Sequence, residues 1–151
     1  GKALEHLEEA KDYYPDNQVI FYFAGVCSAR MAKAETNKPD ERDRLLTQAE
    51  NYYLRAVELD SSFVDALYAL SVIYIFERDR IPDAEPYLDR ILEREKKNTS
   101  AMFLLAQVYV YSGRIEDAMD MYDEIVQAAQ SQAEKRQARD NKQALLEGTF
   151  G

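Results

Sequence analysis

The sequence predicts an all-α protein built from antiparallel helix pairs, and three observations support this. There are five glycines and four prolines in 151 residues, so few residues interrupt helices. No Asn-Gly or Asp-Gly turn separates alternating apolar and polar runs, so the strongest hairpin signal is missing. Apolar residues at helical spacing recur along the chain at regular offsets, which is typical of a helical repeat protein.

The chain has the size of one domain and an acidic composition. It carries 28 acidic and 19 basic side chains, a formal net charge of −9. Because this charge repels polyphosphate, no nucleic-acid partner is expected. The longest apolar runs fall short of the roughly 20 residues that span a bilayer. Cys27 is the single cysteine and fits either redox state, so cytoplasmic and periplasmic locations both stay open.

One set of apolar positions occurs four times. Ala3, Leu7 and Ala10 recur 46 positions later, then after a further 35 and a further 34. The recurring residues are Ala49, Tyr53 and Ala56, then Ala84, Leu88 and Ile91, then Ala118, Tyr122 and Ile125.

A second set alternates with the first. Phe21, Ala24, Gly25 and Ser28 recur at the same offsets of 46 and 35. The repeating unit is therefore a nearly all-apolar first helix followed by an amphipathic second helix. Small residues occupy the positions where the two helices must approach closely.

The offsets give the expected repeat boundaries. We expect one domain over 1–151, organised as a half repeat 2–15, a repeat 18–61 with an insertion 31–43, repeats 64–96 and 99–130, and a capping helix 132–147. The offset of 46 implies about 12 extra residues over a 34-residue period, which should lengthen both helices of their pair and project a polar loop. Since the chain opens within a helical pattern, we expect a fragment of a longer protein, without any targeting signal.

Local signals support these boundaries. Pro39 and Pro82 stand where the first turn of a second helix begins, a position that tolerates a missing N–H. Gly113 stands where a first helix should end in a left-handed cap. Ser131 and Glu134 form a capping-box pattern before a polar stretch that we interpret as a solvating terminal helix.

The order Leu105-Ala106, Tyr109, Gly113, Ala118 and Tyr122 resembles the tetratricopeptide repeat (TPR), whose period is 34. The resemblance covers residues 2 to about 130, although the chain has no tryptophan. It implies a right-handed superhelical α-solenoid with one lone leading helix, three helix pairs and a polar C-terminal capping helix. It also implies a concave groove, lined by the first helix of each pair, that holds a peptide or a helix of a partner protein.

Mapping the repeat onto the sequence places nine side chains in this groove. They are Tyr22, Val26 and Ala29, then Tyr68, Val72 and Ile75, then Phe103, Gln107 and Val110. We expect apolar contacts, oriented by tyrosine hydroxyls and Gln107. The subclass that clamps an acidic C-terminus needs Lys and Asn where Tyr22 and Val26 stand, and basic residues in place of Ser100 and Leu104, so it is disfavoured.

The function expected from this resemblance is a non-enzymatic protein–protein interaction module that supports complex assembly. The alternative is a structural array whose groove is covered by a homodimer partner or by the tail residues Leu145, Leu146 and Phe150. A catalytic role ranks last, because no residue set supplies nucleophile, base and oxyanion donors together.

No cofactor or metal site is expected. His6 lacks further ligands at metal-binding spacing, and Cys27 lacks an activating base and is expected to pack in the core. Four carboxylates share part of one helix face, but Ca²⁺ sites usually wrap a loop around the ion. These four are Glu116, Asp120, Asp123 and Glu124.

Overall fold

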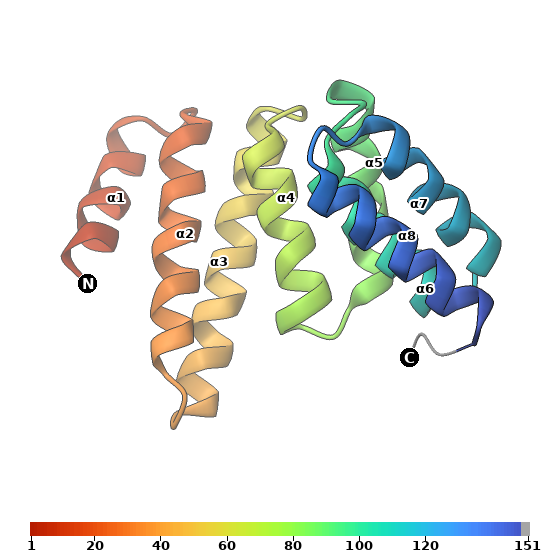
Figure 1. Cartoon of the computed structure of the whole chain (residues 1–151). Coiled ribbons are helices and arrows are strands. Elements are labelled where there is room, and N and C mark those ends of the chain that lie inside the picture. Colours follow the sequence, from red (N-terminus) through yellow and green to blue (C-terminus); the bar gives the residue numbers. More distant parts are fainter. Residues whose placement is uncertain (149–151) are drawn as a thin grey trace. The chain divides into compact units, whose positions relative to one another are not determined.

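A computed structural model describes residues 1–148, and over that range the chain is helical with no strand (Figure 1). The described residues form eight α-helices: α1 (Lys2–Tyr13), α2 (Gln18–Ala34), α3 (Pro39–Leu59), α4 (Val64–Val72), α5 (Glu85–Arg94), α6 (Thr99–Tyr111), α7 (Ile115–Ala128) and α8 (Gln132–Leu146). A π-helix, η1 (Ile73–Glu77), continues α4, and a 3₁₀-helix, η2 (Ile81–Ala84), leads into α5. The predicted all-α class with TPR-like helix pairs is confirmed. The right-handed superhelix stays a prediction.

The chain divides into two compact units, unit 1 (Gly1–Ile73) and unit 2 (Tyr74–Gly151). The boundary falls where the α-helical turns of α4 give way to the π-helix η1, inside the predicted repeat 64–96. The single domain and the repeat boundaries stay predictions, and each unit is described by itself.

Unit 1 contains α1 to α4, with α1 on α2, α2 along α3, and α3 on α4. The Asn17 side chain caps α2 by accepting hydrogen bonds from the backbone N–H groups of Val19 and Ile20, at 3.0 and 3.3 Å. Pro39 opens α3 at the predicted first-turn position, where the missing N–H has no cost. Asn17 and Pro39 thus fix the residues at which α2 and α3 begin.

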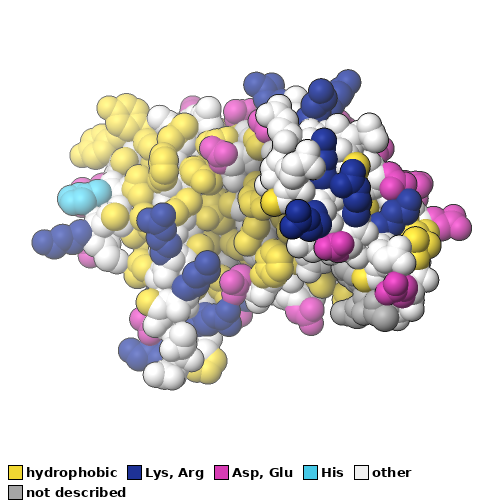
Figure 2. Space-filling view, in the orientation of Figure 1, with side chains coloured by type: hydrophobic (Ala, Val, Ile, Leu, Met, Phe, Trp, Pro, Cys, Tyr) yellow, Lys and Arg dark blue, Asp and Glu magenta, His cyan; other side chains and the backbone are white. Residues whose placement is uncertain are grey.

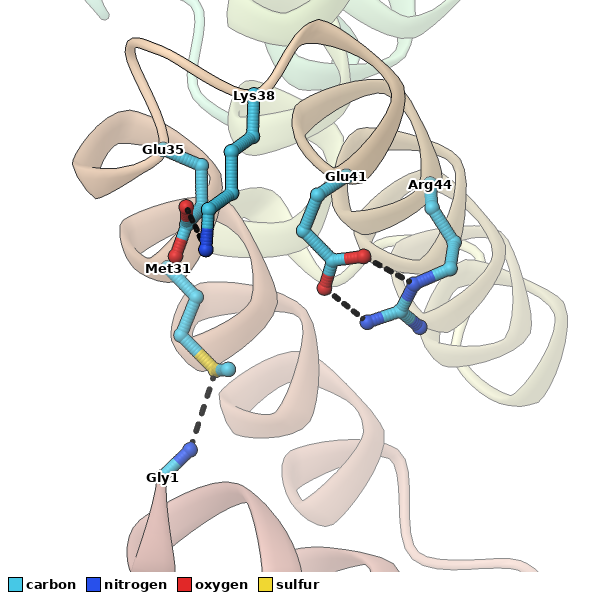
Figure 3. A network of polar contacts seen from close by, with 6 residues as sticks. All are labelled: Gly1, Met31, Glu35, Lys38, Glu41 and Arg44. Atoms are coloured by element: carbon cyan, nitrogen blue, oxygen red, sulfur yellow. Dashed lines mark hydrogen bonds and ion pairs between the residues drawn. The ribbon is translucent and has the colours of Figure 1, made fainter.

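The insertion 31–43 is mostly helix. Both α2 and α3 run into it, and only residues 35–38 lie between them, so the expected polar loop is short. Charged side chains line this end of the pair (Figure 3). Arg44 pairs with Glu41 at 2.6 Å, and this hydrogen bond lowers the pKa of Glu41. Because Glu41 and Arg44 are largely exposed, the pair contributes little to stability.

The helices α2 and α3 meet at Gly25. A Cβ added to Gly25 would lie 2.5 Å from Cε1 and 2.7 Å from Cδ1 of Tyr53. The Tyr53 ring is itself 4% exposed and packs on the Tyr22 ring with centroids 5.9 Å apart, so it has little room to withdraw. Ser28, one turn further along α2, is fully buried and donates to the backbone carbonyl of Ala24 at 3.0 Å. Small residues on α2 thus allow α3 to pack at short distance against it.

Unit 2 contains η1, η2 and α5 to α8. Pro82 opens the 3₁₀-helix η2 rather than an α-helix, and Pro86 lies in the first turn of α5. Gly113 has a φ of 77°, as predicted for a left-handed cap. The next residue, Arg114, pairs with Glu85 at 2.9 Å and with Asp117 at 3.0 Å, and lies over the Tyr109 ring at 4.3 Å from its centroid. Arg114 therefore ties α5, α6 and α7 together.

The terminal helix α8 is fixed by polar contacts. Ser131 Oγ accepts hydrogen bonds from the N–H groups of Ala133 and Glu134, as the capping-box pattern predicts. Glu134 accepts a 2.6 Å bond from the Thr99 hydroxyl, so its carboxylate reaches α6 as well as lying at the N3 position of α8. Lys142 pairs with Asp123 of α7 at 2.9 Å. The polar helix α8 is thus held against both helices of the preceding pair.

We predict that Gly25→Ala destabilises the protein by about 1 kcal/mol. Overpacking costs about 1–3 kcal/mol, whereas the higher helix propensity of Ala returns roughly 0.8–1 kcal/mol. Urea denaturation measures the difference. In a Tyr53→Leu background, which removes the ring, the same change should be neutral or stabilising. A higher free energy of unfolding for the Gly25→Ala single variant would contradict this, because the Tyr53 ring would then move aside without cost.

We predict that Ser131→Ala lowers the free energy of unfolding by about 1 kcal/mol, the usual cost of a lost N-cap. Hydrogen exchange should also become faster in the first turn of α8. The matched control is Ser100→Ala, at an exposed position in the first turn of α6, which should change stability by less than about 0.5 kcal/mol. Equal effects of the two substitutions would contradict a capping role for Ser131.

Candidate functional site: an apolar pocket in unit 2

The nine predicted groove residues lie on four helical segments. Tyr22, Val26 and Ala29 of α2 are partly exposed, as are Tyr68 and Val72 of α4 and Phe103, Gln107 and Val110 of α6. Ile75 of η1 is the exception, since it is only 6% exposed. It therefore offers little surface to a partner.

In unit 1 the predicted residues border an aromatic cluster. The Tyr22 ring lies 5.2 Å from the Phe23 ring and 5.3 Å from the Phe63 ring, measured between centroids. Burial raises the pKa of the Tyr22 hydroxyl, with a smaller contribution from Asp65. Phe23 keeps 48% of its surface exposed. Hydrophobic side chains gather over the α1–α2 side of this unit in Figure 2.

In unit 2 three predicted residues, Phe103, Gln107 and Val110, line one pocket of about 400 Å³. The Phe103 ring packs against the Tyr122 ring, with centroids 6.4 Å apart, and both residues line the pocket. The full lining is Ile81 of η2, Phe103, Leu104, Gln107, Val110 and Tyr111 of α6, Tyr122 of α7 and Asn141 of α8.

The pocket combines apolar walls with neutral polar groups, because no lining residue is charged. Gln107 and Asn141 each offer a carboxamide, which both donates and accepts hydrogen bonds. Burial raises the pKa of the Tyr122 hydroxyl, and its hydrogen bond with Asn141 opposes part of that rise. Tyr122 is therefore a neutral phenol at pH 7. The arrangement suits an apolar ligand that carries amide groups.

Asn141 was not predicted from the sequence, although the repeat period points to it. Asn141 lies 34 positions after Gln107, the period of the repeat. The residues that stand 34 after Phe103 and Val110 are Gln137 and Ala144, and Gln137 donates to Asn141 Oδ1 at 2.7 Å. The helix α8 thus continues the first-helix series with polar side chains, and its polar composition concealed this.

Three further features were considered in the sequence: His6, Cys27 and the C-terminal tail. His6 is exposed and Cys27 is partly buried against the cluster of Leu4, Ala24 and Tyr52. Among residues 1–148, no group of three or more His, Cys, Asp or Glu side chains could hold a metal ion. The C-terminal tail was the alternative cover for the groove. Leu145 is partly buried and Leu146 is 61% exposed, whereas Phe150 lies outside the described residues.

Within the described range 1–148, no helix is both long and apolar enough to cross a membrane.

Comparisons with known proteins agree with the repeat pattern. The family model of the tetratricopeptide repeat matches residues 76–141. The chain is also 26% identical over 135 residues to a TPR repeat-containing protein of Borreliella burgdorferi. That alignment covers 89% of this chain, and the chain spans 58% of the length of the relative.

Tetratricopeptide repeats are generally protein–protein interaction modules, and proteins built from them are generally non-enzymatic scaffolds. The family match falls in unit 2 and includes all of the pocket-lining residues. The matched residues, the relative and the series of helix pairs all lead to the same assignment. The resemblance of the chain to the tetratricopeptide repeat family, first seen in the sequence, is therefore confirmed.

Proposed function

We propose that this protein is a non-enzymatic interaction module that supports complex assembly, and that its unit 2 pocket binds an extended apolar segment of a partner protein. The observation that carries the proposal is the uncharged pocket of about 400 Å³ with two carboxamides at its wall. This volume lies within the roughly 300–1,000 Å³ of typical ligand sites. It is large enough for an apolar side chain and part of the adjoining backbone.

The chemistry of the walls indicates how such a segment would bind. An aliphatic or aromatic side chain inserted between Phe103 and Val110 loses contact with water, which is worth about 1.5–3 kcal/mol for full burial. A peptide backbone beside it leaves N–H and C=O groups that need partners. Gln107 and Asn141 can satisfy both kinds of group. The pocket thus supplies affinity through the apolar wall and orientation through the carboxamides.

The same chemistry disfavours a charged terminus as the ligand. A free carboxylate buried in the pocket would lack a cationic partner among the lining residues, and a buried unpaired charge is costly. An internal segment of a protein has no such charge. This argument agrees with the absence of Lys and Asn at the positions of Tyr22 and Val26.

In unit 1, we propose Tyr22, Val26 and Ala29 of α2 and Tyr68 and Val72 of α4 as a second set of apolar contacts. Their support is partial exposure together with the aromatic cluster around Tyr22. Ile75 is left out because it is buried. A homodimer partner covering these residues remains the structural alternative.

We predict that Val110→Glu weakens binding of a peptide selected from a displayed library of random linear peptides by at least about tenfold, or 1.4 kcal/mol. The new carboxylate would enter the apolar wall without a cation. Val110 is partly exposed in the free protein, so folding should survive, which circular dichroism checks. Fluorescence anisotropy with the labelled peptide gives Kd.

The matched control is Val19→Glu on α2, where the valine is 43% exposed and lies outside the pocket. It should leave Kd unchanged. Selected peptides that bind the Val110→Glu variant as tightly as the wild type would contradict the pocket as the binding site. A library that yields no binder to the folded protein would contradict peptide binding itself.

A further inference from the structure

The turn between α1 and α2 carries two exposed tyrosines that the repeat does not require. Tyr13 is 80% exposed and Tyr14 is 63% exposed, and hydrophobic side chains gather around this turn at the upper left of Figure 2. At the equivalent positions of the three later turns the chain has no aromatic residue, so the packing of the repeat does not need these rings. The equivalents are Leu59, Arg94 and Ala128 for Tyr13, and Asp60, Glu95 and Ala129 for Tyr14.

The two tyrosines border a hollow of about 570 Å³ that is open to solvent and is lined by residues 13–19 of unit 1. This volume lies within the roughly 300–1,000 Å³ of typical ligand sites. Val19 adds an apolar side chain that is 43% exposed. Among the lining residues only Asp16 is charged, and its side chain is 90% exposed. The hollow thus combines aromatic faces with a single carboxylate.

Two basic side chains of unit 1 contact groups other than this hollow. Arg55 donates a hydrogen bond to Glu58 at 2.9 Å and comes only within 3.9 Å of Asp16, which is too long for a hydrogen bond. Lys11, in the last turn of α1, lies over the Tyr52 ring at 5.8 Å from its centroid. The Asp16 carboxylate therefore keeps the capacity to accept hydrogen bonds from a cationic ligand.

Backbone hydrogen bonds hold the turn in place. The N–H of Tyr14 donates to the carbonyl of Ala10 at 2.9 Å, and the N–H of Asn17 donates to the carbonyl of Tyr14 at 3.2 Å. The Asn17 side chain also caps α2, and the ring of Pro15 fixes its own φ. Because the backbone is already ordered, a ligand that binds here loses little affinity to ordering of the turn.

We propose that this hollow binds an arginine side chain in an extended basic segment of a partner protein. A guanidinium is planar, stacks on aromatic faces and forms paired hydrogen bonds with a carboxylate, so Tyr13, Tyr14 and Asp16 together match it. A lysine ammonium lacks both the plane and the fork of donors. The net charge of −9 attracts a basic segment from a distance. The proposal is independent of the pocket in unit 2, whose uncharged walls suit a different ligand.

The test measures binding of a fluorescein-labelled peptide of alternating glycine and arginine by fluorescence anisotropy, at physiological ionic strength, where salt screens the net charge. We expect Tyr13→Leu combined with Tyr14→Leu to raise Kd by about fivefold or more, and Asp16→Asn to raise it by about threefold or more. Peptides with lysine or the uncharged citrulline in place of arginine should bind at least about threefold more weakly. All three side chains are exposed, so folding should survive, which circular dichroism checks.

Two control variants separate this site from net charge and from the pocket in unit 2. Asp140→Asn removes one exposed negative charge on α8 and should leave Kd nearly unchanged, whereas Val110→Glu alters the unit 2 pocket and should not weaken binding of the arginine peptide. Equal weakening by Asp16→Asn and Asp140→Asn would overturn the proposal, because net charge alone would then explain the binding. So would a lysine peptide that binds as tightly as the arginine peptide, or weakening by Val110→Glu, which would place the peptide in unit 2.

Discussion

The helices α2 and α3 approach so closely that only a small side chain fits between them, and the packing of unit 1 depends on this constraint. Gly25 meets the Tyr53 ring with no space for a Cβ. Ser71 and Ala106 stand at the equivalent positions of the later first helices, and both are fully buried. Because close packing makes a core sensitive to a single methylene, Gly25 fixes how α3 lies on α2.

The same repeated geometry produces the pocket. The first-helix series continues past α6 into α8, where Asn141 follows Gln107 after one period. The packing positions of α8 keep a small residue, fully buried Ala138, whereas its pocket side carries the Asn141 carboxamide. A polar capping helix prevents the array from ending in an exposed apolar face. Here that helix also supplies one of the two carboxamides of the pocket wall.

Local sequence was sufficient for the features that depend on neighbouring residues. The cap at Ser131 and the left-handed Gly113 follow from signals within a few residues, and the helix pairing follows from the offsets at which apolar positions recur. Long-range features were not predictable: Glu134 finds Thr99, 35 residues away, and the π-helix Ile73–Glu77 carries no local signal. Three pocket residues were identified from the repeat, and Asn141 follows Gln107 by one repeat period, whereas Ile81 and Tyr111 line the pocket because of how η2 and α6 pack.

The central claim is that the pocket in unit 2 is a peptide-binding site. The most direct measurement is an NMR titration of the isotope-labelled chain with one selected peptide. The account predicts that shifts concentrate on Phe103, Gln107, Val110 and Asn141, with direct contacts between the peptide and the Val110 methyl groups. Shifts confined to residues of unit 1, with the pocket signals unchanged at saturation, would contradict it.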